Sequence, residues 1–158
     1  MSLDVNERLA ILREIAKSWL QLRKALRSLS EHELVAPGTV GSWSFKALMA
    51  HITIRERVLM QRIRALEQGR DTSELDALEE GVDAFDADAV RRQIEKPIDE
   101  VREEFDRTHA ELMELLERTP VLSRTLVAGA TFEHYREHLL DVLTYLKSRD
   151  SGRRTHRR

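Results

Sequence analysis

The fold of this chain depends most on residues 42–60, which read SWSFKALMAHITIRERVLM. Ser44 is a typical N-cap, because its hydroxyl can accept a hydrogen bond from a backbone N–H of the first helical turn. Apolar residues then recur every three or four positions, which predicts an amphipathic helix that runs to about Gln68 and stops at Gly69. His51 lies on the apolar stripe of this helix. A buried imidazole needs a side chain, a backbone carbonyl or a metal ion as its partner.

Three further long helices are predicted from the same spacing of apolar positions. Their expected ranges are residues 5–29, about 89–117 and about 131–148. The chain has only 6 glycines and 3 prolines, which argues against a β-rich domain with many turns. We therefore expect an all-α four-helix bundle.

The connections between these helices carry their own signals. Ser30 and Glu33 have the spacing of a capping box, which predicts a short helical turn after the first helix. Residues 70–88 are acidic and predict a long connection between helices two and three, with one short helical turn in it. Such a connection is typical of a crossing between helices that are not adjacent antiparallel neighbours. Pro97 either begins the third helix or bends it.

The two ends of the chain differ in composition. Residues 1–149 contain all four predicted helices and form the expected bundle domain. The last six residues read RRTHRR and hold four arginines, although the formal net charge of the whole chain is −2. We expect residues 150–158 to be a basic, disordered tail.

Composition also limits the classes of function. The chain has no cysteine, which excludes a disulfide framework, a thiolate metal site and a cysteine nucleophile. The body is acidic, so we expect no nucleic-acid partner. The longest apolar runs fall far below the roughly 20 residues that span a bilayer, so no membrane partner is expected either. We expect a cytoplasmic protein with a small-molecule substrate, and a homodimer through an exposed helix face stays open.

Two further histidines lie in residues 131–143, which read TFEHYREHLLDVL. His134 and His138 are four residues apart, so they share one face of the predicted fourth helix. With His51 from helix two they form a candidate three-nitrogen metal site. Three protein ligands with an open position are typical of a catalytic metal centre. If no metal binds, the three histidines are polar core residues.

One local motif and the other histidines are considered for other roles. His134–His138 reads H-x-x-E-H, a signature of inverted zinc proteases. We reject that interpretation, because those enzymes need a distant acidic ligand and only 20 residues follow His138. Glu137 is then a solvated carboxylate, with a role as a base or second-sphere group as the alternative. We expect His32 at the surface and His109 in a structural role.

Two stretches of the sequence resemble the DinB-like superfamily, which includes ClbS/DfsB-type bundles and thiol-dependent transferases. Residues 41–51, GSWSFKALMAH, are similar to the family pattern G-x-W-S-x-K-D-L-L-A-H at the start of helix two. Residues 131–139 are similar to its helix-four pattern of two histidines separated by three residues. One departure is Ala47, where an acidic residue is common. The resemblance implies an up-down-down-up bundle with one divalent ion held by His51, His134 and His138.

The resemblance implies a class of activity and not a substrate. It predicts thiol transfer to, or hydrolysis of, a small electrophilic substrate, with metal-bound thiolate or water as the nucleophile. Zinc or nickel is the expected metal, with iron or manganese as alternatives, and a low-molecular-weight thiol is a candidate cofactor. Arg55 and Trp43 are candidate substrate-binding residues, although a surface arginine and a packing tryptophan are the alternatives. The rival function is a non-catalytic metal-binding or protein-interaction bundle.

Overall fold

The computed structural model describes residues 3–41, 43–80 and 89–155, and almost all of its regular structure is helical. No β-strand occurs in these three ranges. The long helices are α1 (Val5–Arg27), α3 (Phe45–Glu67), α6 (Ile98–Arg118) and α8 (Phe132–Thr155). The short ones are α2 (Glu31–Val35), α4 (Ser73–Glu80), α7 (Arg124–Val127) and the 3-10 turn η1 (Ala128–Ala130).

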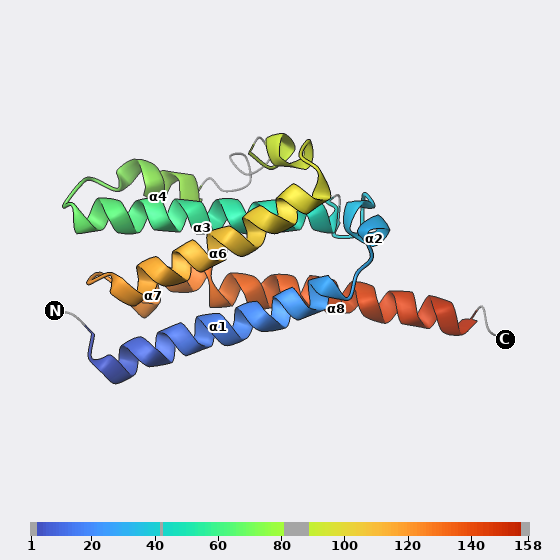
Figure 1. Cartoon of the computed structure of the whole chain (residues 1–158), viewed down its shortest axis with the longest axis horizontal. Helices are drawn as coiled ribbons and strands as arrows, with labels where there is room; N and C mark the ends of the chain where they lie inside the picture. The colour runs from blue at the N-terminus through green and yellow to red at the C-terminus, as the bar shows by residue number, and fades with distance from the viewer. Residues whose placement is uncertain (1–2, 42, 81–88, 156–158) are drawn as a thin grey trace.

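The long helices pack as two close pairs (Figure 1). In that view the chain runs one way along α1 and α8 and the opposite way along α3 and α6. Most contacts between long helices join α3 to α6 and α1 to α8. Fewer contacts join the pairs to each other, either α3 to α8 or α1 to α6. We call these two looser junctions the α3–α8 seam and the α1–α6 seam.

Helix α3 confirms the prediction from residues 42–60 at both ends. The Ser44 hydroxyl accepts a hydrogen bond of 3.0 Å from the backbone N–H of Ala47. At the other end Gln68 is the C-cap, and Gly69 has a φ of +65°. Glycine adopts this left-handed conformation without strain, and it lets the N–H of Arg70 reach the carbonyl of Ala65 at 2.8 Å. The sequence therefore sets both ends of the helix that carries His51.

The predicted third helix is divided at Pro97. Residues 89–94 are helical, the chain then leaves the helix, and α6 begins at Ile98 with Pro97 as its N-cap. Proline has no N–H and disfavours a helical conformation in the residue before it, so the helix cannot run through this point. The long connection also contains more helix than expected, because α4 spans Ser73–Glu80. The part of that connection at residues 81–88 lies outside the described residues.

Helix α8 continues seven residues beyond its predicted end at Ser148 (Figure 1). Two contacts, one on each side of Ser148, tie this end of α8 to α2. The Tyr145 hydroxyl donates to Glu33 at 2.7 Å, and the Arg149 guanidinium donates to the same carboxylate at 3.2 Å. Residues 150–155, which we expected to be a disordered tail, are helical. Residues 156–158 lie outside the described chain.

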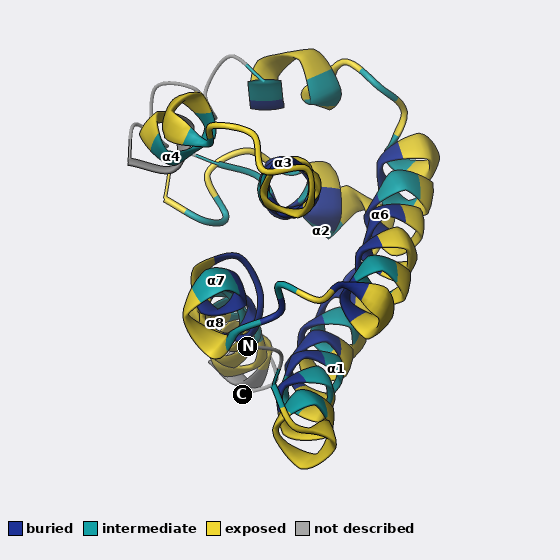
Figure 2. Cartoon of the chain, turned by 90° about the vertical axis from the view of Figure 1, so that its left-hand side faces the viewer, coloured by how far each residue is buried: buried dark blue, intermediate teal, exposed yellow. Residues whose placement is uncertain are grey.

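Burial is concentrated on the faces that the four long helices turn toward each other (Figure 2). Helix α3 is buried on most of its surface, whereas α1 and α6 keep an exposed face. The largest fully buried side chains include Ile15, Leu22, Phe45, Leu48, Ile52, Leu59, Ile63, Phe105, Leu112, Leu116 and Tyr135. Burying each large apolar side chain stabilises the fold by about 1.5–3 kcal/mol. None of the helices in the described ranges is both long and apolar enough to cross a membrane.

Candidate metal centre

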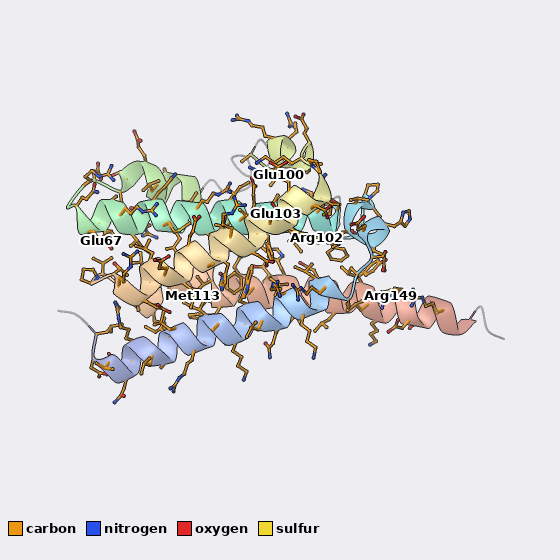
Figure 3. All side chains as sticks on the ribbon, in the orientation of Figure 1. Glu67, Glu100, Arg102, Glu103, Met113 and Arg149 are labelled. Carbon is orange, nitrogen blue, oxygen red and sulfur yellow. The ribbon has the colours of Figure 1, made fainter. Side chains whose placement is uncertain are left out.

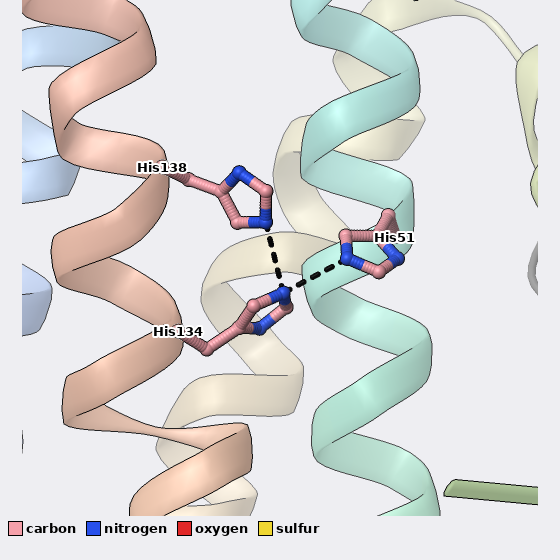
Figure 4. A group of neighbouring side chains, drawn as sticks. All are labelled: His51, His134 and His138. Atoms are coloured by element: carbon pink, nitrogen blue, oxygen red, sulfur yellow. Dashed lines mark hydrogen bonds between the residues drawn. The ribbon is translucent and has the colours of Figure 1, made fainter. Parts of the chain in front are cut away.

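The α3–α8 seam brings together the three predicted histidines (Figure 4). His51 comes from α3, and His134 and His138 come from successive turns of α8. The Nε2 atom of His134 lies 2.8 Å from Nε2 of His51 and 2.9 Å from Nε2 of His138. All three ligand atoms lie within 4.8 Å of one another, so this group could hold a metal ion.

Local structure before α8 places His134 in the first helical turn. The side chain of Ser123 caps α7, and the 3-10 turn η1 follows directly. The Thr131 hydroxyl donates to the carbonyl of Val127 at 2.7 Å, and the Thr131 carbonyl accepts from the N–H of Tyr135 at 2.8 Å. The helix therefore starts at a fixed point, and the spacing of four residues then places His138 one turn above His134.

The distances between the nitrogens suit a shared ion better than hydrogen bonds. A neutral imidazole nitrogen carries either one hydrogen or one lone pair, so Nε2 of His134 can donate to only one of its two neighbours. Metal–nitrogen bonds of about 2.0–2.1 Å place two ligands about 2.9 Å apart in an octahedron and about 3.4 Å apart in a tetrahedron. The two Nε2 separations fall at the octahedral value and need only a small outward movement for the tetrahedral one.

Burial keeps the imidazoles of His134 and His138 in the neutral form that binds metals. His134 is 6% exposed, and burial lowers its pKa to about 2. The nearby His138, His51 and Arg55 shift that pKa in the same direction, because each disfavours a second positive charge. Burial also lowers the pKa of His138, while its hydrogen bond to Asp141 opposes the shift. At neutral pH, His134 and His138 are therefore ready to accept a cation.

Asp141 is a residue of this site that the sequence analysis missed. Its carboxylate lies 2.9 Å from Nδ1 of His138, one helical turn along α8. The carboxylate accepts the Nδ1 hydrogen, which leaves the lone pair of His138 on Nε2, facing the other two histidines. The signal was available, because an acidic residue three positions after a helical histidine can reach its ring.

A second polar group, also missed, lies in the core beside the histidines. Glu56 of α3 is fully buried, and its Oε2 accepts hydrogen bonds of 3.0 Å from Tyr135 and from Nδ1 of His109. Burial raises the pKa of Glu56, against the effect of the two hydrogen bonds. Trp19 stacks on the His109 ring at 3.8 Å between ring centroids. Glu56 thus joins α3 to α6 and to α8, and its α8 partner directly follows His134.

The sequence held a sign of this buried group as well. Glu56 falls on the stripe formed by Ile52, Leu59 and Ile63, all of which are fully buried. A carboxylate at that position has to be paired inside the core. His109, which we expected in a structural role, is one of its partners.

Of the remaining candidates, two lie beside the histidines and two are exposed to solvent. Arg55 is half-buried and close enough to His134 to affect its pKa. Its buried Nε has no hydrogen-bond partner among the described residues. Trp43 is half-buried and meets the His51 ring edge-on at 5.2 Å between centroids. Glu137 and His32 are both exposed, as expected for solvated side chains.

Comparison with known proteins gives one match. A family model described as the DinB superfamily matches residues 14–147. No curated protein and no solved structure gives a significant match to the chain. The matched range includes all four long helices in whole or in part, and it contains His51, His134 and His138.

Proposed function

Because the chain belongs to the DinB superfamily, we propose that it is a metal-dependent enzyme built on an up-down-down-up bundle. Its reaction is the transfer of a low-molecular-weight thiol to a small electrophilic substrate, or the hydrolysis of that substrate. The observation that carries this proposal is the convergence of three Nε2 atoms, from His51, His134 and His138, on one point of the α3–α8 seam.

The three histidines would hold a divalent ion, with zinc or nickel ahead of iron or manganese because nitrogen ligands generally bind the later first-row metals more tightly. Such an ion supplies Lewis-acid activation of a nucleophile at neutral pH. Three protein ligands leave room for a nucleophile and substrate, as in catalytic rather than structural sites. Asp141 orients His138, and the buried walls of the seam keep His134 neutral.

Arg55 and Trp43 are the proposed substrate-binding residues. The guanidinium of Arg55 lies near His134, and its Nε has no partner among the described residues, which supports a role in binding an anionic group. A carboxylate of the substrate or of the thiol is a suitable ligand. Trp43 is half-buried against His51 and offers an apolar ring to the substrate body.

A second candidate function is a non-catalytic metal-binding or interaction bundle that acts as a homodimer. The observation that favours it is a pair of exposed leucines on α8. Leu140 is 65% exposed and Leu143 is 47% exposed, and their spacing of three places them on one side of the helix. In this case the histidines hold an ion without turnover.

Metal content is the first test of the leading proposal. We expect about one equivalent of divalent metal in protein purified without an affinity tag, and its loss in His138→Ala. Asp141→Asn should weaken metal binding by about 10–100-fold, because it removes the carboxylate that orients His138. His32→Ala is the matched control, since it removes an exposed histidine that is not part of the three-histidine group. A native chain that stays empty after reconstitution with zinc, nickel, iron and manganese would contradict the proposal.

A second measurement separates the enzyme from the non-catalytic bundle. If a coordination position is open, a small thiol should change the visible spectrum of the cobalt-substituted protein. Thiol-transfer and hydrolysis assays then follow with the native metal. Arg55→Gln should raise KM for an anionic substrate without changing metal content. A spectrum insensitive to thiols, together with a concentration-dependent dimer, would favour the second candidate.

A further inference from the structure

The α1–α6 seam holds a cavity on the opposite side of the bundle from the histidines. Its volume is about 260 Å³, and α1, α2, α3 and α6 all contribute to its lining. In Figure 4, which looks into the α3–α8 seam, α6 lies behind the histidines. The cavity is therefore separate from the candidate metal centre. Its size lies just below the range of about 300–1,000 Å³ for drug-sized ligands, which points to a small ligand.

The floor and the rim of this cavity differ in chemistry. The floor is apolar, formed by Leu26, Leu34, Met49 and Phe105, and because each is at most 4% exposed it offers a ligand only a small apolar area. The rim is charged, formed by Arg23, Arg27, Arg102 and Asp106. Three guanidinium groups and one carboxylate thus surround an apolar base. This combination suits a molecule with an apolar body and an anionic head.

One of the three arginines is already neutralised. The guanidinium of Arg23 binds both oxygens of Asp106, at 2.8 and 2.9 Å. This fork holds the pKa of Asp106 below its ordinary value. The pair also links α1 to α6 across the seam. Arg23 and Asp106 are therefore a fixed edge of the cavity, and the charge available to a ligand comes from the other two arginines.

Arg27 and Arg102 are the two arginines whose positive charge is available to a ligand. Arg27 is exposed and makes no hydrogen bond or close ion pair with any residue that the structure describes, although its charge is near enough to help lower the pKa of Asp106. Arg102, labelled in Figure 3, lies 3.5 and 3.7 Å from two exposed carboxylates, those of Glu31 and Asp99. Exposed pairs at such distances contribute little free energy, so an incoming anion can replace them. Guanidinium groups bind carboxylate and phosphate oxygens in a two-pronged geometry.

We propose that the α1–α6 seam is a binding site for a small amphiphilic anion, whose apolar body packs on Phe105 and Met49 and whose head binds Arg27 and Arg102. This site is independent of the metal centre. The head group is a carboxylate, sulfonate or phosphate, and the body is a short aliphatic chain or a single ring system. A compact polar anion gains nothing from the apolar floor, and a neutral amphiphile gains nothing from the rim.

Naphthalene-1-sulfonate, a fluorescent amphiphilic anion with a single ring system, is the probe for this site. We expect it to bind the native full-length chain with a stoichiometry near one, and octanoate to displace it while octanol does not. The double variant Arg27→Gln, Arg102→Gln should weaken binding by about tenfold or more. Both residues lie at the surface rim, so the variant should keep the native circular dichroism spectrum and urea midpoint.

Two controls give the result its meaning. Arg107→Gln changes another exposed arginine of α6 outside the cavity lining and should leave binding unchanged. His138→Ala should also leave it unchanged, which keeps this test apart from that of the metal centre. Unaltered binding in the folded double variant would overturn the proposal. Displacement by octanol as effective as that by octanoate would overturn it as well.

Discussion

The two seams of this bundle are similar in position but opposite in chemistry. Each is a looser junction between the α3/α6 pair and the α1/α8 pair. The α3–α8 seam contains the buried imidazoles of His51 and His134, 7% and 6% exposed. The α1–α6 seam contains Arg23 and Asp106, whose side chains are 26% and 45% exposed. We call the α3–α8 junction the dry seam, because these two imidazoles are largely buried, and the α1–α6 junction the wet seam, because its ion pair is partly exposed.

This difference in exposure decides what the polar groups can do. In the dry seam, burial lowers the pKa of His134 to about 2, so its ring stays neutral and can accept a cation. In the wet seam the arginines stay charged, and Arg102 can exchange its exposed carboxylate partners for an incoming anion. The same fold thus offers a cation site on one side and an anion site on the other. Three predictions follow for the polar groups that hold the seams together.

The largest effect is expected from Glu56, the buried group beneath the α3–α8 seam. Glu56→Ala should destabilise the protein by about 3–5 kcal/mol, because it leaves the buried Tyr135 hydroxyl and His109 ring without their shared acceptor. Urea unfolding followed by circular dichroism measures this loss. Glu56→Gln keeps an acceptor oxygen in the same place and should cost much less.

The matched control is Glu67→Ala, at the exposed end of the same helix. It should change the free energy of unfolding by no more than about 0.5 kcal/mol. If Glu56→Ala had an equally small effect, the buried polar group would not be holding α3 to α6 and α8. Burial in the dry seam would then not make its polar groups more important for stability than exposed ones.

Lowering the pH should cause a smaller loss of folding stability. The pKa of His134 is lower in the folded protein than its ordinary value of 6.5, so below pH 6.5 the unfolded chain binds a proton that the folded chain does not. Stability is therefore fully present above pH 6.5 and falls as the pH drops toward 2. The slope for one such group approaches about 1.4 kcal/mol per pH unit. Metal-free protein in a chelator should show this fall in urea titrations between pH 6.5 and 4.5.

Two comparisons identify the groups responsible. His134→Asn should flatten the slope in that window, with His138 accounting for what remains. Glu33 acts only below pH 4.5. Although burial favours its neutral form, hydrogen bonds from Tyr145, the Ser30 backbone and Arg149 lower its pKa to about 2. A native slope that persisted unchanged in His134→Asn would show that the buried imidazole is not its source.

Local sequence signals were enough to predict much of this fold and the three histidines of the candidate site. Ser44 and Gly69 define α3 because caps and left-handed glycines act over a few residues. The spacing of His134 and His138 is likewise a property of one helix. Their meeting with His51, 83 residues before His134, was only a candidate from the sequence pattern, and the family resemblance was what implied it.

Most of the features that were missed depend on contacts between helices, with Asp141 as the exception, since its contact with His138 lies within α8. Helix α8 was predicted to end near Ser148, because nothing local shows that Arg149 binds Glu33 of α2. Glu56 was overlooked because its partners lie on α6 and α8. The cavity of the α1–α6 seam needs residues from four elements, and no single stretch of sequence contains its pattern. Apolar periodicity shows which face is buried but not which helix covers it.

The smallest effect is expected from the ion pair of the wet seam. A double-mutant cycle with Arg23→Gln and Asp106→Asn should give a coupling energy of about 0.5–1 kcal/mol, because solvent screens a pair that is partly exposed. The coupling should shrink further in 1 M salt, where the Debye length is only about 3 Å. The cycle between Glu56→Gln and Tyr135→Phe should give a larger, salt-insensitive coupling, since both of those side chains are buried. Equal couplings with equal salt dependence would mean that exposure does not distinguish the two seams.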